Sequence, residues 1–165
     1  MRVLSPRPRN RTFMTIASLL LALTLSSSTF APGATVPMSM VAKDCGGKNS
    51  SPELSWSGAP AGTKSFALIV HDPDAPVPGG YYHWVVYNIP ATADAIEAGS
   101  ARYSGYYGPC PPAGKVHHYN FTLYALDLDR IDANAPPLNA KQLLARIQGH
   151  VLGQTTLTGL FTLPR

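Results

Sequence analysis

Charged residues are scarce in this sequence, at 13% of 165 residues, and lysine and arginine gather only near its N-terminus. A protein that binds nucleic acid needs a basic patch, so this scarcity argues against a nucleic-acid partner. The sequence also lacks the Gly-x-Ser-x-Gly motif of α/β hydrolases and the His-x-x-x-His or Glu-x-x-His spacing of helical metal sites. We therefore expect no nucleic-acid partner, no metal and no cofactor.

An apolar run from residue 13 to residue 25 predicts an export signal. Four arginines precede it and account for the whole net charge of +4: Arg2, Arg7, Arg9 and Arg11. The run is shorter than the about 20 residues that cross a bilayer, and a basic segment before about 7–15 apolar residues is typical of a signal peptide. We interpret residues 1–31 as this peptide, cleaved after Ala31 or after Ser28, with an uncleaved anchor as the alternative. The prediction is a periplasmic or extracellular protein with no stable membrane span after processing.

Residues 32–165 predict a single domain, because a chain of this length can bury one core. The sequence has two cysteines, Cys45 and Cys110, and both lie beyond the export signal. In an oxidising compartment they can pair, and closing a loop of that length is worth about 4 kcal/mol in the chain-entropy model. Two separate thiols are the alternative, because the sequence does not fix the distance between them.

Alternating apolar residues predict short strands. The clearest strand runs from 65 to 71 and is apolar on both faces, which predicts burial on both sides. In the strand from 82 to 89, Trp84 and Val86 share one face, whereas Ile89 falls on the other. Further strands are expected at 54–58, 119–126 and 151–163.

A single helix is expected late in the chain. Asn139 is a favoured N-cap, Gln142 completes a capping box, and Gly149 supplies a stop. Many short strands with turns between them and one late helix indicate a mostly β, sandwich-like domain.

Acidic and imidazole side chains stand at the ends of the predicted strands. Asp72 and Asp74 flank a proline after the buried strand, His83 lies at the start of the next strand, and His117 precedes a later one. If they converge, a carboxylate that accepts a hydrogen bond from an imidazole raises the imidazole pKa, and cationic imidazoles can hold a phosphate or a carboxylate. The stiff stretch 108–112 would form a wall beside them, with its glycine allowing a close backbone approach. An ordinary turn after the buried strand is the simpler alternative.

Other chemistries stay open at this point. Asp72, His83 and His117 could form a metal triad. His117 and His118 do not easily bind one metal together, because neighbouring residues of a strand point to opposite faces. Cys110 with His117 could form a nucleophile pair, and the imidazoles could transfer protons in a hydrolase or lyase. An inhibitor that binds a partner kinase or protease is a third hypothesis.

These motifs together resemble the phosphatidylethanolamine-binding protein family, in its bacterial branch of Raf-kinase-inhibitor-like proteins. The matching stretches are 49–56, 72–76, 83–90, 108–112, 117–119 and 149–153. The resemblance implies a two-sheet antiparallel β fold with a small anion-binding pocket at one end. Carried over by position, the pocket residues are Asp72, His83, Gly108, Pro109, His117 and Tyr119, with Asp74 supporting the loop.

Together these features lead to the hypothesis of an exported, non-enzymatic protein that binds a small anionic or phosphorylated ligand. The connection from 91 to 107 looks shorter than is usual in bacterial members of the family, which predicts either a more open pocket or weaker binding of its ligand.

Overall fold

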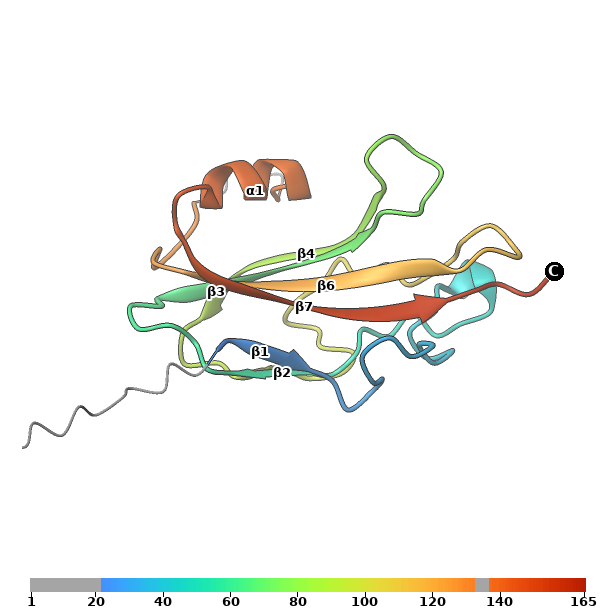
Figure 1. The fold of residues 1–165 in the computed structure, drawn as a ribbon, viewed down its shortest axis with the longest axis horizontal. Helices are drawn as coiled ribbons and strands as arrows, with labels where there is room; N and C mark the ends of the chain where they lie inside the picture. Colours follow the sequence, from blue (N-terminus) through green and yellow to red (C-terminus); the bar gives the residue numbers. More distant parts are fainter. Residues whose placement is uncertain (1–21, 133–136) are drawn as a thin grey trace, which may run out of the picture.

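Two antiparallel sheets and one short helix make up the protein, in a computed structural model that describes residues 22–132 and 137–165. The sheets lie face to face, and the helix covers the outer side of the larger one (Figure 1). The predicted mostly β, two-sheet fold is therefore confirmed. Within the described ranges, no helix has both the length and the apolar character needed to cross a membrane.

The larger sheet has the strand order β4-β3-β6-β7. Its members are β3 (Ser65–Asp72), β4 (Tyr81–Pro90), β6 (His117–Leu126) and β7 (Val151–Phe161). β3 pairs antiparallel with both β4 and β6, so it lies inside the sheet. It is apolar on both sides, as predicted, because Phe66 and Val70 face the smaller sheet while Ala67 and Ile69 face the helix.

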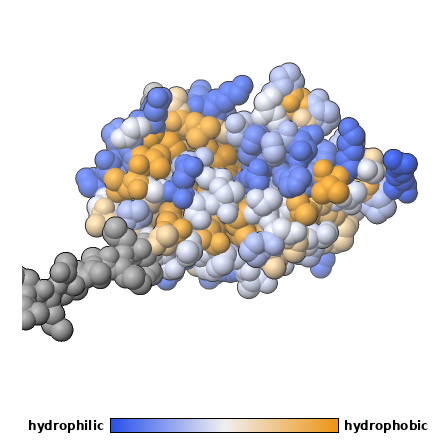
Figure 2. All heavy atoms as spheres, viewed as in Figure 1, coloured by the Kyte–Doolittle hydropathy of each residue, from blue (hydrophilic) through white to orange (hydrophobic). Residues whose placement is uncertain are grey.

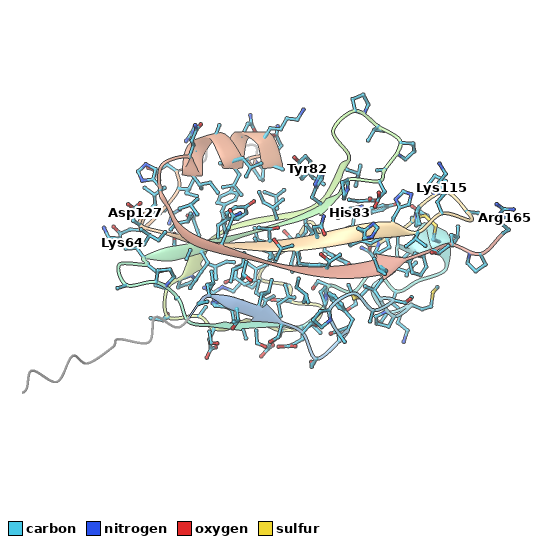
Figure 3. All side chains as sticks on the ribbon, in the orientation of Figure 1. Lys64, Tyr82, His83, Lys115, Asp127 and Arg165 are labelled. Atoms are coloured by element: carbon cyan, nitrogen blue, oxygen red, sulfur yellow. A yellow bond between two sulfur atoms is a disulfide. The ribbon has the colours of Figure 1, made fainter. Side chains whose placement is uncertain are left out.

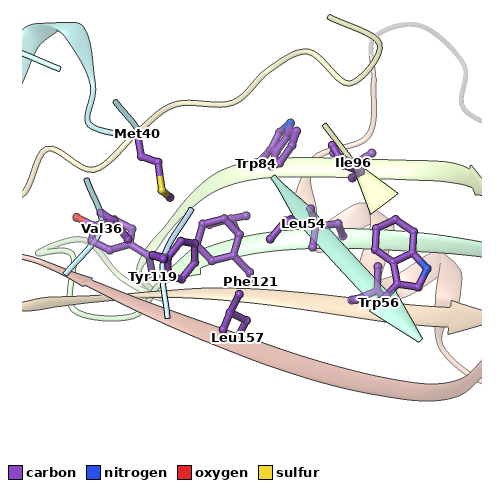
Figure 4. Packing of buried hydrophobic residues seen from close by; sticks show 14 of the residues in the cluster. Val36, Met40, Leu54, Trp56, Trp84, Ile96, Tyr119, Phe121 and Leu157 are labelled. Atoms are coloured by element: carbon purple, nitrogen blue, oxygen red, sulfur yellow. The ribbon is translucent and has the colours of Figure 1, made fainter. Parts of the chain in front are cut away.

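The smaller sheet closes the main core from the other side. It has the order β1-β2-β5, from β1 (Thr24–Ser26), β2 (Leu54–Ser57) and β5 (Ala95–Ile96). Leu54 and Trp56 of β2 reach toward the larger sheet, where Trp84, Phe121 and Leu157 belong to the same buried cluster (Figure 4). A short 3₁₀ helix, η1 (Lys43–Cys45), lies in the connection between β1 and β2.

The helix α1 (Ala140–Ile147) forms as its sequence predicts. The Asn139 side chain accepts the Gln142 N–H, and the Gln142 side chain accepts the Asn139 N–H, both at 2.9 Å. This capping box satisfies two backbone donors that a helix start leaves free. Leu143 and Ile147 are buried against the second face of the larger sheet. Around the helix, hydrophobic and hydrophilic residues interleave on the surface (Figure 2).

The prediction for Ile89 is wrong. Ile89 packs in the main core with Trp84 and Val86, instead of on the opposite face. The cause is an irregularity in the pairing of β3 with β4, next to Asn88, which has a φ of 58°. An extra residue in one strand reverses the alternation of side chains beyond it.

Residues 24–31 of the predicted signal segment lie within the described fold. β1 pairs with β2, and Phe30 is 6% exposed against Phe121, with 5.4 Å between the ring centroids. The Ser28 N–H and hydroxyl donate to the Glu53 carboxylate at 2.7 and 2.8 Å. The backbone hydrogen bond from Ser28 is the main reason why the pKa of Glu53 is lowered. The boundary at residue 31 stays a prediction, and a cut there would remove all of these contacts.

Candidate functional site

Strand topology brings the predicted polar residues to one end of the larger sheet. Because β3 runs antiparallel to β4 and β6, its last residue lies beside their first residues, and Asp72 pairs with Tyr81 while His71 pairs with Asn120. Asp72, His83 and His117 thus meet although they are far apart in sequence. Figure 3 shows His83 toward the end of the molecule that also carries Lys115 and Arg165, away from Lys64 and Asp127.

Asp72 and His117 form a buried hydrogen-bonded pair. His117 Nδ1 donates to Asp72 Oδ2 at 2.7 Å, and both side chains are almost fully buried. The second oxygen, Asp72 Oδ1, accepts the N–H of Asp74 at 2.9 Å. The carboxylate is therefore fixed in orientation, and it leaves His117 Nε2 as the ring atom free to contact a ligand.

His83 differs from the sequence-based expectation. Its Nε2 is 4.0 Å from Asp72 Oδ2, too far for a hydrogen bond, and its Nδ1 donates to the Tyr107 carbonyl at 2.7 Å. Burial is the main influence and lowers the pKa of His83, whereas the hydrogen bond to Tyr107 and the charge of Asp72 oppose this shift. The rise in pKa expected from the carboxylate is therefore outweighed by burial at His83, and the net shift is downward.

A β-bulge explains how His83 comes to face this site. The pairing of β3 with β4 shifts register between Trp84 and Tyr82, which leaves His83 as the extra residue of β4. Bulges re-aim a side chain next to functional sites. His83 is 6% exposed and its ring meets Tyr119 edge-on, with 5.0 Å between centroids.

These side chains line a cavity of about 300 Å³. The lining residues are Asp72, Ala75, Pro76, Val77, Tyr81, His83, Tyr107, Cys110, Pro111, Pro112, His117 and Tyr119. None of them is lysine or arginine, so the imidazoles are the only lining groups that can become positively charged. Among the described residues, Tyr119 Oη is buried and has no hydrogen-bond partner, and burial raises the pKa of this hydroxyl. A buried hydroxyl without a partner calls for a ligand or a water.

Sequence reasoning missed the aromatic rim of the cavity. Tyr81 meets His83 edge-on at 4.7 Å between centroids, and Tyr107 lies parallel to His83 at 6.2 Å. Both tyrosines are partly exposed, and the Tyr107 hydroxyl donates to Asp44 at 3.0 Å. The only signal in the sequence was their position, one directly before the predicted strand and the other directly before Gly108.

Gly108 and Pro109 precede the lining residues Cys110, Pro111 and Pro112 and do not line the cavity themselves. The Pro109 carbonyl accepts the Ala42 N–H at 3.0 Å, and the Gly108 N–H donates to the Asn49 side chain at 2.7 Å. The close approach predicted for Gly108 is to its own chain, because a Cβ there would overlap the Met40 carbonyl oxygen. The expectation that both residues line the pocket is corrected accordingly.

Replacing Gly108 with alanine is expected to destabilise the protein by about 1–3 kcal/mol, because the added methyl must displace backbone. Gly105→Ala is the matched control in the same loop, since its methyl meets no atom within 4 Å and adds only the strain of a positive φ. Urea unfolding of the two variants measures the difference. Gly108 does not have a positive φ, so a loss at 108 no larger than the loss at 105 would contradict close contact with the Met40 carbonyl as the reason for glycine there.

A disulfide joins the wall to η1. Cys45 and Cys110 are bonded, with Cα atoms 5.6 Å apart, which settles the pairing that the sequence left open. The thiol nucleophile considered for Cys110 is thereby ruled out in this oxidised form. The metal triad also finds no support in residues 22–132 and 137–165, where no cluster of three His, Cys, Asp or Glu is placed to hold an ion.

Comparisons with known proteins agree with this geometry. Residues 26–162 match the model of the family described as phosphatidylethanolamine-binding protein. UPF0098 protein YbcL of Escherichia coli is 43% identical over 110 residues, which cover 55% of this chain and 60% of YbcL. A UPF0098 protein of Methanothermobacter thermautotrophicus is 44% identical over 71% of this chain and 85% of its own length. LppC of Mycobacterium tuberculosis, whose name marks it as a candidate lipoprotein, is 40% identical over 84% of this chain and 72% of its own length.

Solved structures extend the likeness to three dimensions. The crystal structure of E. coli YbcL, described as a new member of the mammalian PEBP family, superimposes with a TM-score of 0.79 and 32% identity. The match covers 85% of this chain and 98% of the YbcL chain. CT736 of Chlamydia trachomatis, whose name marks it as a candidate PEBP homologue, gives a TM-score of 0.75 at 34% identity, over 86% of this chain and 97% of its own.

Proposed function

Because the chain belongs to the phosphatidylethanolamine-binding protein family, we propose that it is an exported, non-enzymatic protein that binds a small anionic or phosphorylated ligand in the cavity beside Asp72. One observation carries the proposal. His83 and His117 face the same hollow as the partnerless Tyr119 hydroxyl. Together they offer two ring nitrogens and one hydroxyl donor to a single small ligand.

Charge in the cavity makes the proposed binding depend on protons. With neutral imidazoles the lining carries only the negative charge of Asp72, which repels an anion. Protonation of His83 and His117 reverses the sign, and a bound anion then favours the protonated rings. The complex therefore holds more protons than the free protein, so the affinity for an anion increases as the pH falls.

Apolar walls around this polar floor suit a small ligand. Pro76, Val77, Pro111 and Pro112 line the cavity beside the charged groups. Prolines lower the conformational entropy that the cavity wall loses when it is ordered around a ligand. The disulfide at Cys110 restricts the motion of the same wall, which favours a site that is already shaped before a ligand binds.

Phosphate is expected to raise the unfolding temperature of the wild-type protein at pH 6, and His83→Ala is expected to abolish this rise. At one hundred times its dissociation constant a ligand adds about 2.7 kcal/mol to the free energy of unfolding. Thermal unfolding with and without phosphate measures the effect. His150→Ala is the control, because His150 pairs with Asp127 and does not line the cavity.

Phosphate stabilisation that survives in His83→Ala would contradict the proposal. Turnover of a phosphate ester or carboxylate ester that follows imidazole titration would favour the hydrolase or lyase alternative. Binding of a kinase or protease that is unchanged in His83→Ala would favour an inhibitor that does not use the cavity. The export part of the proposal is supported by the basic and apolar N-terminal sequence and by the lipoprotein name given to LppC.

A further inference from the structure

Adjacent histidines of β6 bind two carboxylates, one at the end of β3 and one in the loop that follows it. His117 Nδ1 donates to Asp72 inside the protein, and His118 Nδ1 donates to Asp74 Oδ2 at 2.7 Å on its surface. The His118 backbone N–H donates to the same Asp74 oxygen at 2.8 Å. We call the contact between Asp74 and His118 the clasp. Because neighbouring side chains of a strand point to opposite faces, the two pairs attach the start of the loop on opposite faces of β6.

The clasp is connected to the cavity through the backbone. Asp74 accepts from His118 with its side chain and donates its N–H to Asp72 Oδ1 at 2.9 Å. The residues that follow, Ala75, Pro76 and Val77, line the cavity. Hydrogen bonds from the Val77 N–H to the Ala75 carbonyl and from the Gly80 N–H to the Val77 carbonyl keep the loop compact. His71 Nε2 of β3 donates to the Gly79 carbonyl at 2.8 Å, which attaches the far end of the loop, whereas the clasp attaches the end that precedes residues 75–77.

We infer that His118 is a positioning residue for the cavity, which acts through Asp74 to fix both the Asp72 carboxylate and the wall formed by residues 75–77. This inference rests on the proposed anion site, because its effect is read as ligand affinity. His118 does not line the cavity, and its side chain is 52% exposed. Its contribution is to hold Asp74, whose pKa is lowered mainly by the hydrogen bond from the His118 side chain.

The chain supplies its own control for an exposed ion pair of this kind. His150 Nδ1 donates to Asp127 Oδ1 at 2.8 Å, and both side chains are 44% exposed. Asp127 lies toward the opposite end of the molecule from Lys115 (Figure 3). Loss of this pair therefore resembles loss of the clasp in kind, but it leaves the cavity untouched.

The test compares phosphate affinity at pH 6 in the wild type, His118→Ala, His118→Asn and His150→Ala. His118→Ala is expected to weaken binding about fivefold to tenfold, the scale of one typical hydrogen bond, because the pair is exposed and screened by solvent. His118→Asn is expected to stay within about twofold of the wild type, because its amide N–H can take the place of Nδ1. His150→Ala is expected to bind like the wild type. Equal weakening by alanine and asparagine, or by His150→Ala, would overturn the inference, as would no weakening at all.

A second measurement keeps the inference separate from the proposed function. The Asp74 amide proton is bonded to Asp72 only while the loop is held, so His118→Ala is expected to speed its hydrogen exchange about fivefold to tenfold without any ligand. Unchanged exchange would overturn the inference. A wild-type protein that phosphate does not bind would overturn the proposed function, and exchange at Asp74 would then decide the role of His118 alone.

Discussion

A chain that begins at residue 32 is expected to be less stable than one that begins at residue 22 by at least about 3 kcal/mol. The shorter chain lacks β1 and Phe30, and removal of a buried phenylalanine side chain alone costs about 3–5 kcal/mol. It also leaves Glu53 without the two hydrogen bonds from Ser28. Chemical unfolding of the two purified chains measures the difference.

The control for this comparison is Phe30→Ala in the longer chain. It keeps β1 and the contacts of Glu53, so it is expected to show most, but not all, of the loss. If the two chain lengths are equally stable, the packing of Phe30 contributes nothing and a cut after Ala31 is harmless. If the shorter chain is less stable, we expect the export segment to be cut before Leu23, whose side chain packs against the main core.

Replacing Cys45 and Cys110 together by serine is expected to lower the free energy of unfolding by about 4 kcal/mol. The bond closes a separation of 65 residues, and the chain-entropy model gives about that value for such a loop. The fold is expected to persist, because hydrogen bonds of Asn49 to Gly108 and Tyr106 still join the two segments. Phosphate affinity is expected to fall as well, since Cys110 lines the cavity.

Urea unfolding of the double variant measures this loss, with the wild type under reducing conditions as a second route to the same state. The two are expected to agree within about 1 kcal/mol, because both open the same loop. A loss below about 1 kcal/mol would contradict this estimate and would show that residual structure already holds the two segments together in the unfolded ensemble.

Sequence reasoning succeeded where a local pattern carries the outcome. The faces of β3 and the capping box of α1 follow from alternation and from residue type alone. It failed at Ile89, because a single irregular residue at Asn88 reverses the alternation and no rule of composition places that residue. A register shift depends on how two strands pair with each other. The sequence of either strand alone does not contain that information.

For the site, the sequence predicted the residues that carry charge and the wall at 110–112, and it missed the tyrosines of the rim. Asp72, His83, His117 and Tyr119 meet because consecutive antiparallel strands return to the same end of a sheet. The rim tyrosines resemble ordinary strand residues in one dimension. The lowered pKa of His83 also had to come from the structure, because burial depends on neighbours from other strands.

Calorimetric titration of sulfate into the wild-type protein at pH 6 and pH 8, in buffers of different ionisation heat, tests the central proposal most directly. Sulfate keeps the same charge over this range, so any pH dependence belongs to the protein. The cavity of Asp72, His83 and His117 predicts tighter binding at pH 6 and net uptake of protons on binding, with an affinity gain of up to about tenfold per pH unit for each proton taken up. Equal affinity at both pH values without proton uptake, or no binding at either, would contradict an anion site built on protonated imidazoles.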